Sequence, residues 1–279
     1  MNITIIGCGY VGTALAEYWH QKQSHLITAT TTTNERVEEL EKVADKVVVM
    51  KGDDATAMQS VVQNQDVVLV SVAPISDRQV SAEGYAETYL PTAKNLIAAL
   101  SNAPTAKQII YLSSCSVYGN RNGEWVDETV TIEPPDKLGQ VLAQTEQILL
   151  SAKSEDVKVS ILRMGGIYGP ERELGKRFIR IAGKTLPGTG ESFMNWIHLD
   201  DIVCAVDFVL VNQCGGIYNL VNDVTMRIRD LCDQICDREN LPKVLWNPSE
   251  PSQRDFNTRV SNQKLKAAGY KFIHPDKMI

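Results

Sequence analysis

The chain has 279 residues, of which 43% are hydrophobic and 22% charged, an ordinary composition for a globular protein with one α/β core and a smaller appended region. Its formal net charge of −6 disfavours a general nucleic-acid binder, because neutralising phosphates requires a basic face. The longest apolar runs, such as residues 67–70, are too short to span a bilayer, and the N-terminus carries no basic signal-peptide region, so we expect a cytoplasmic protein.

The first twelve residues predict a strand, a phosphate-binding turn and the start of a helix over residues 11–23. Residues 2–6 are apolar and rich in β-branched side chains, as in a buried strand. The GxGxxG spacing follows at once, and we assign all six of its residues to cofactor binding: Gly7, Cys8, Gly9, Tyr10, Val11 and Gly12. The first glycine allows the tight turn, the second leaves room for a pyrophosphate, and the third lets helix and strand pack closely. A glycine-rich turn without a ligand is the alternative, but the strand before and the helix after favour a dinucleotide site.

Strands and helices alternate through the first 165 residues. Strands are expected at 26–30, 47–51, 66–71, 108–113 and 157–163, with helices at 33–43, 58–64, 84–100 and 137–151. The helix at 33–43 rests on a capping-box pattern from Thr32 to Glu35. Because each parallel crossover needs a covering helix, the alternation predicts a Rossmann-type, doubly wound parallel α/β sheet of about seven strands.

After about residue 165 the alternation loosens. Short helices are expected at 176–182, 200–211 and 229–239, and residues 217–220 could return to the sheet. No linker or repeat separates this part, so we divide the chain into a dinucleotide-binding domain, 1–165, and a smaller substrate-side region, 166–279, packed on the first and not independent. The six cysteines and four histidines are scattered, which predicts reduced, mostly buried thiols and no metal site.

Four motifs in order carry a family resemblance. They are residues 7–12, Tyr-Leu-Ser-Ser-Cys-Ser-Val-Tyr-Gly at 111–119, Leu-Arg-Met-Gly-Gly-Ile-Tyr-Gly-Pro at 162–170 and Asn-Trp-Ile-His-Leu-Asp-Asp at 195–201. Over nearly its whole length the chain resembles an extended short-chain dehydrogenase/reductase of the NAD-dependent epimerase/dehydratase superfamily. The resemblance implies an NAD(P)-dependent oxidoreductase or epimerase that acts on a small polar, sugar-like substrate.

The chain departs from that family at the acid/base pair. The family carries Tyr-x-x-x-Lys on the helix after the fifth strand, whereas alignment on Glu146 puts Leu138 and Leu142 at these positions. The Asn that the family often places on the long helix falls at Tyr89. Leucine cannot transfer a proton, so we expect an atypical member with a non-standard proton donor. A catalytically inactive NAD(P)-sensing regulator is the rival hypothesis.

The second strand bears on the choice of cofactor. Thr31 stands where an NAD-preferring site has its ribose-binding carboxylate, which favours NADP, with NAD as the alternative. Thr31, Thr32 and Arg36 could donate hydrogen bonds to a 2′-phosphate. The alternative is that Thr32 only caps the helix and that Arg36 is a solvated surface charge. The resemblance places Asp53 at the adenine, where a simple turn is equally expected. Backbone contact with the cofactor is expected at the end of the fourth strand, in Ser71, Val72 and Ala73.

The remaining candidates belong to the reaction. The resemblance implies that Ser114 bonds a substrate oxygen, whereas a bond to its own loop is the structural alternative. Tyr118 and His198 are candidate substitutes for the missing acid/base, each with packing as its alternative. Arg163 and Asn195 are assigned to substrate binding, with an ion-pair role as the alternative for Arg163. Asp200 is expected to cap a helix, and Asp127 with Glu128 to form a turn. The expected partner is an unidentified small molecule, without nucleic acid or membrane, and a homodimer is left open.

Overall fold

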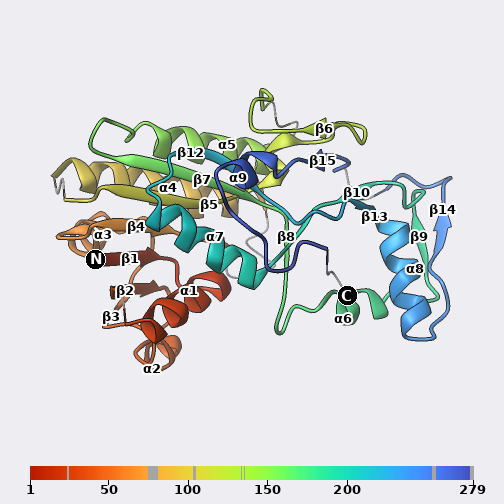
Figure 1. The fold of residues 1–279 in the computed structure, drawn as a ribbon, viewed down its shortest axis with the longest axis horizontal. Helices are drawn as coiled ribbons and strands as arrows, with labels where there is room; N and C mark the ends of the chain where they lie inside the picture. Colours follow the sequence, from red (N-terminus) through yellow and green to blue (C-terminus); the bar gives the residue numbers. More distant parts are fainter. Residues whose placement is uncertain are drawn as a thin grey trace. The chain divides into compact units, whose positions relative to one another are not determined.

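The computed structural model divides the chain into two compact units (Figure 1). The structure describes residues 1–23, 25–74, 81–102, 105–132, 134, 136–252 and 256–276. Unit 1 comprises Met1–Ser114, Pro135–Leu162 and Val203–Ile217. Unit 2 comprises Cys115–Pro134, Arg163–Ile202 and Tyr218–Ile279. One crossing between the units, at Leu162 to Arg163, lies close to the boundary expected after residue 165, and the dependence of the second region on the first stays a prediction.

A seven-stranded parallel sheet has the order β12-β7-β5-β4-β1-β2-β3 and confirms the predicted fold class. Its strands are β1 (Asn2–Ile6), β2 (Leu26–Thr31), β3 (Lys46–Val49), β4 (Val67–Val70), β5 (Gln108–Ser114), β7 (Lys158–Met164) and β12 (Gly216–Leu220). The order reverses at β1, which pairs with both β2 and β4. Ligands of open α/β sheets bind at such a reversal, outside the carboxyl ends of the strands.

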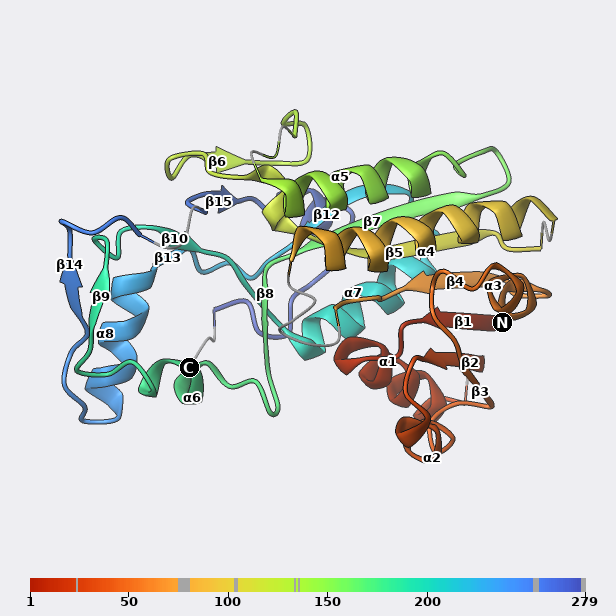
Figure 2. The ribbon, with the colours of Figure 1, turned by 180° about the vertical axis from the view of Figure 1, so that it is seen from behind.

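Helices cover both faces of this sheet. They are α1 (Tyr10–Gln21), α3 (Ala55–Val62), α4 (Ala82–Asn102), α5 (Lys137–Leu150) and α7 (Leu199–Val211). The helices α4 and α5 lie side by side along one face, and α3 packs on α4 (Figure 2). On α1, Trp19 donates to the Asp207 carboxylate of α7 at 2.9 Å, and Tyr18 donates to it at 3.2 Å. The central strand β4 is apolar on both faces, because Val67, Val68, Leu69 and Val70 are all buried.

The helix expected over residues 33–43 is shorter than predicted. A 3₁₀ turn, η1 (Asn34–Arg36), precedes a single helical turn, α2 (Val37–Leu40). The capping-box prediction is wrong, because Thr33 occupies the N-cap and its side chain makes no capping bond. The Thr33 amide instead donates to Thr31 Oγ1 at 3.3 Å, so the chain turns before the helix begins.

In its described residues, unit 2 contains four two-stranded sheets and short helices. The strand pairs are β6 (Trp125–Val126) with β15 (Arg259–Val260), β8 (Gly166–Tyr168) with β11 (Trp196–His198), β9 (Thr185–Pro187) with β14 (Leu245–Asn247), and β10 (Phe193–Met194) with β13 (Met226–Arg227). The helices are η3 (Cys115–Tyr118), α6 (Leu174–Ile179), α8 (Ile228–Arg238) and α9 (Gln263–Ala267). An apolar cluster around Trp196 forms the core, to which α6 contributes Phe178 and α8 contributes Ile235.

Within the described part of the chain, no helix has both the length and the apolar character that crossing a membrane requires. Four of the six cysteines are buried, which agrees with the expectation of mostly buried thiols.

Candidate functional site

The three glycines of the first turn meet different surroundings. Gly7 has φ +88°, and a Cβ there would lie 2.9 Å from Ser71 O and from the Val72 backbone. At Gly12, a Cβ would lie 2.8 Å from Gly7 O and 3.2 Å from the Ile5 side chain. Both positions are therefore held to glycine by close packing. A Cβ at Gly9, in contrast, would meet no heavy atom within 4 Å. The protein's own packing does not explain Gly9, whereas a ligand above the turn would.

The start of α1 offers an environment for an anion. Gly9 is the N-cap, no side chain caps the helix, and the first turn contains no acidic residue. Amides in the first turn of a helix lack intrahelical acceptors, and the helix dipole favours negative charge there. Thr30 holds the turn in place, because its hydroxyl accepts from the Gly7 amide at 2.9 Å and its carbonyl accepts from the Cys8 amide at 2.7 Å. The sequence reasoning missed Thr30, which resembles any other polar residue of a strand.

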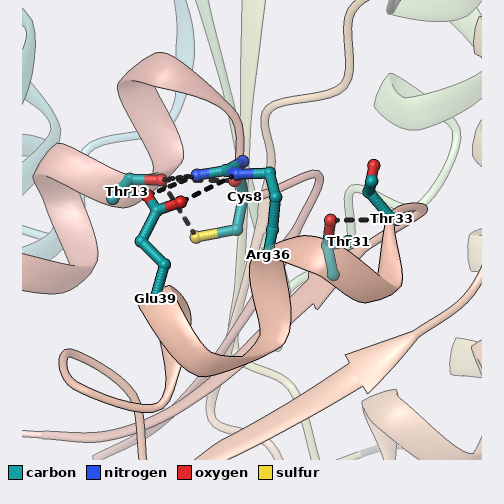
Figure 3. Close-up of polar contacts among 6 residues, drawn as sticks. All are labelled: Cys8, Thr13, Thr31, Thr33, Arg36 and Glu39. Carbon is teal, nitrogen blue, oxygen red and sulfur yellow. Dashed lines mark hydrogen bonds and ion pairs between the residues drawn. The ribbon is translucent and has the colours of Figure 1, made fainter.

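Arg36 is fixed against the glycine turn (Figure 3). Its guanidinium donates to the Cys8 carbonyl and, at 3.0 Å, to Thr13 Oγ1. It also forms an ion pair with Glu39, with 2.8 Å between Nη2 and Oε1. The hydrogen bond to Glu39 raises the pKa of Arg36, and the same bond lowers the pKa of Glu39. Arg36 is therefore not a freely solvated charge, and Thr13 and Glu39 join the candidate site without having been predicted.

The side chain of Cys8 lies beneath the turn. It is 1% exposed, and burial raises its pKa to about 11. The thiol is therefore protonated at neutral pH, and its contribution to the turn is packing rather than charge.

The other expected cofactor residues also lie in unit 1, in varied settings. Thr31 is buried, and its hydroxyl accepts from the Thr33 amide, while Thr32 is exposed. Asp53 is exposed in the turn after β3, immediately before Asp54, which caps α3 by accepting from the Ala57 amide at 2.9 Å. The remaining positions are the half-buried Tyr10, Ser71 and Val72, the buried Val11 and the exposed Ala73.

The helix α5 carries Leu138 and Leu142, the two positions that the sequence alignment predicts for the acid/base pair. Leu138 is half-buried and Leu142 is 4% exposed. Glu146, on which the alignment rests, faces β5 and accepts from Ser113 Oγ at 2.6 Å. Ser114, the expected substrate ligand, is half-buried at the end of β5.

Tyr118 and Arg163 form a buried cluster in unit 2. The Tyr118 hydroxyl donates to Asn219 Oδ1 at 2.7 Å and accepts from Arg163 Nη1 at 3.0 Å. Tyr118 is 1% exposed and Arg163 2% exposed, and burial raises the pKa of Tyr118 to about 12. This arrangement supports the packing interpretation of Tyr118 and a structural role for Arg163.

Asn195 is bonded to the chain around β15. Its Nδ2 donates to Thr258 O at 2.8 Å, and its Oδ1 accepts from the Val260 amide at 3.0 Å. Asp127 accepts from the Thr129 amide at 2.9 Å within the predicted turn, and the neighbouring Glu128 accepts from the Asn219 amide. The side chains of Asn195, Asp127 and Glu128 therefore make hydrogen bonds within the fold, which supports a structural role for them.

The helix α7 begins at Leu199, so the expectation that Asp200 caps it is wrong. The Asp200 amide instead donates to His198 Nδ1 at 3.1 Å. The Asp200 carboxylate lies 3.3 Å from His198 Nδ1 and 2.8 Å from His274 Nε2. The sequence showed the histidines as dispersed, whereas the fold brings two of them together. The buried Asp201 carboxylate, also missed, accepts from the Ile273 and His274 amides.

Comparison with known proteins shows similarity along most of the chain. The model of the NAD dependent epimerase/dehydratase family matches residues 3–220. Protein YeeZ of Escherichia coli (strain K12) is 38% identical over 135 residues, which span 48% of this chain and 46% of that protein, so the match spans about half of that relative's length. The chloroplastic epimerase family protein SDR39U1 homolog of Arabidopsis thaliana is 25% identical over 268 residues, 92% of this chain and 74% of that protein.

Solved structures share the fold. A functionally unknown conserved protein from Silicibacter pomeroyi DSS aligns with a TM-score of 0.79 at 22% identity, over 99% of this chain and 94% of that one. DesIV, a dTDP-glucose 4,6-dehydratase from Streptomyces venezuelae with NAD and TYD bound, aligns with a TM-score of 0.81 at 17% identity, over 97% and 92% of the two chains.

Proposed function

The chain belongs to the NAD dependent epimerase/dehydratase family, and from this premise we propose that it binds a nicotinamide dinucleotide at the turn formed by residues 7–12. The observation that carries the proposal is the open space at Gly9, between two glycines whose Cβ positions are blocked by backbone. The uncapped, acid-free start of α1 supports a pyrophosphate there. DesIV, a neighbour with the same fold, has NAD bound.

Each part of the site has a role in this proposal. The first-turn amides of α1 would bind the pyrophosphate, and the Ser71 and Val72 backbone would border it where β4 ends. When bound, the nicotinamide supplies or accepts hydride. We further propose a preference for NADP, because Arg36 holds a cation on the turn and Thr31 replaces the carboxylate that would repel a 2′-phosphate. Glu39 opposes this preference, since a 2′-phosphate has to compete with it for the guanidinium.

For the reaction, we propose an oxidoreductase or epimerase that acts on a small polar, sugar-like substrate through a non-standard proton donor. The half-buried Ser114, at the carboxyl end of β5, would orient a substrate oxygen. The alternative is a catalytically inactive protein that senses the cofactor. Leu138 and Leu142 favour this second function, because neither side chain can exchange a proton.

Substitution of Gly9 tests the binding site without disturbing the fold. Because a Cβ there meets nothing, Gly9→Ala and Gly9→Val should keep wild-type unfolding midpoints. Calorimetric titration with NADP and NAD should show weaker binding for the alanine variant and loss of binding for the valine variant. Ala98→Val serves as the control, because it adds two methyl groups at an exposed position of α4. This variant should bind both cofactors with wild-type affinity. A folded Gly9→Val variant with wild-type affinity would refute the proposed site.

A further inference from the structure

Three metal-ligating side chains converge at one place in unit 2. His198 ends β11, Asp200 lies in the first turn of α7, and His274 belongs to the C-terminal segment. One ligand atom from each lies within 4.8 Å of the other two. The three residues are half-buried, exposed and half-buried, so an ion could reach them from solvent.

The distances suit a tetrahedral ion. Zinc binds imidazole nitrogen and carboxylate oxygen at about 2.0–2.2 Å, which separates two tetrahedral ligands by roughly 3.4 Å. His198 Nδ1 lies 3.3 Å from Asp200 Oδ2, and His274 Nε2 lies 2.8 Å from the same oxygen. Small side-chain rotations would therefore bring all three atoms onto one ion.

His198 and Asp200 already face each other at the start of α7. His198 Nδ1 lies 3.1 Å from the Asp200 amide nitrogen and 3.3 Å from Asp200 Oδ2. An imidazole nitrogen has a single lone pair, so a metal ion bound at Nδ1 would replace the amide as its partner.

The surrounding structure holds the three groups in position. The Tyr168 ring packs edge-on against His198, with 5.0 Å between centroids, and the His198 and His274 rings lie 4.0 Å apart. Asp201, which is fully buried, accepts from the His274 amide at 3.0 Å and from the Ile273 amide at 2.6 Å. The C-terminal segment is thus anchored next to α7 by its backbone, which leaves the His274 side chain available to the cluster.

We propose that His198, Asp200 and His274 form a binding site for a divalent transition-metal ion of the zinc type. Two imidazoles and one carboxylate favour zinc, cobalt, nickel or copper over magnesium and calcium, which prefer oxygen ligands. The ion joins the C-terminal segment to the start of α7, and its fourth position is open to water. The site lies in unit 2 and does not depend on the dinucleotide turn of unit 1.

The test uses the full chain, stripped of metal with a chelator that is then removed. Calorimetry with zinc chloride should give one ion per chain, while magnesium chloride should give no saturable binding. Cobalt chloride should give visible d–d bands without the thiolate charge-transfer band that cysteine ligands produce. His198→Gln, Asp200→Asn and His274→Gln should each weaken zinc binding by at least about tenfold. Mutation of residues that only hydrogen-bond to metal ligands already lowers metal affinity by about 10–100-fold. The His274 variant keeps the backbone bond to Asp201 and should therefore fold.

His20→Gln, at an exposed position of α1, is the matched control and should bind zinc like the wild type. Bound zinc should also slow tryptic cleavage after the exposed Lys271, close to His274. The proposal is overturned by the absence of saturable zinc binding, by wild-type affinity in the His198 and His274 variants, or by a thiolate band. Unchanged cleavage with zinc bound would overturn the proposed link between the C-terminal segment and α7.

Discussion

Arg36 donates to both carboxylate oxygens of Glu39 along one edge of its guanidinium, with 2.8 Å between Nη2 and Oε1 and 3.3 Å between Nε and Oε2. The same guanidinium donates to Thr13 and to the Cys8 carbonyl, so one ion pair connects α2 to the glycine turn. An anion that binds Arg36 must share it with Glu39. The two residues are therefore expected to affect cofactor choice in opposite directions.

Arg36→Ala should lower NADP affinity and leave NAD affinity nearly unchanged. A hydrogen bond to a charged group contributes about 1.5–3 kcal/mol, which is roughly one to two decades in affinity. Dissociation constants for both cofactors measure the effect. The assignment is wrong if NAD binds the wild type as tightly as NADP, or if the variant weakens both equally.

Glu39→Gln should raise NADP affinity by roughly 1.4- to fivefold, because an exposed ion pair contributes about 0.2–1 kcal/mol and its competition is removed. The exposed neighbour Glu38 provides the control, and Glu38→Gln should change NADP affinity less. Equal gains for the two variants would point to a general change of charge instead of release of Arg36.

The protein should lose stability in alkali because the buried Cys8 thiol becomes ionised there. Its folded pKa of about 11 exceeds the usual value of 9.0, so the folded state binds more protons than the unfolded state between these pH values. The stabilisation is complete below pH 9 and is lost as the pH rises to about 11, with an upper limit of ~3 kcal/mol. Urea unfolding at pH 8 and pH 11 should show a smaller loss for Cys8→Ala than for the wild type. An unchanged loss in Cys8→Ala would contradict the prediction.

Asp201→Asn should strongly destabilise unit 2. The buried carboxylate accepts from two backbone amides and from the Tyr270 hydroxyl, and an amide side chain cannot satisfy all of these donors. Each bond to a charged group contributes about 1.5–3 kcal/mol, so a loss of at least about 3 kcal/mol is expected in chemical denaturation. In chelator, the exposed Asp200→Asn should change stability by only about 0.5 kcal/mol. Similar losses for the two variants would contradict the anchoring role of Asp201.

Tyr118→Phe should cause a loss of about 1–3 kcal/mol of stability, because it leaves Arg163 and Asn219 without their shared partner. A spectrophotometric titration should show one phenol fewer ionising near pH 12 in the variant. If the variant keeps wild-type stability but loses turnover, Tyr118 is the proton donor and the packing interpretation fails.

Turnover should not require the usual Tyr/Lys pair. With a panel of carbonyl and sugar-nucleotide substrates, Ser114→Ala should lower the wild-type rate and leave NADP affinity unchanged. Loss of an acid/base group accounts for ~10²–10⁴ in rate, so a substitute donor should be detectable by mutagenesis.

Leu138→Tyr combined with Leu142→Lys provides the opposite test, once its fold and cofactor affinity have been verified. If the wild type is inactive and only this double variant turns over, the protein is a cofactor binder that lacks its catalytic pair.

Local features of the chain could be predicted from the sequence. The turn at residues 7–12 is fixed by the steric needs of Gly7 and Gly12, and alternating apolar strands and helices indicated the parallel sheet. The same local reasoning failed at residues 33–43, where the Thr33 amide bonds to Thr31 instead of starting a longer helix. Of the candidate residues, the glycines were predicted from the GxGxxG spacing, and Arg36 was predicted from its place just after the second strand.

Only the tertiary structure decided which distant side chains meet. Asp200 and His274 are 74 positions apart, and Tyr118 and Asn219 are 101 apart, so no local pattern connects them. Arg36 could be identified in the sequence, but its partners Thr13 and Glu39 are ordinary polar residues until α2 folds against the turn. Periodicity and glycine spacing act over a few residues and therefore specify elements, whereas a polar cluster forms from side-chain positions that exist only once those elements have packed.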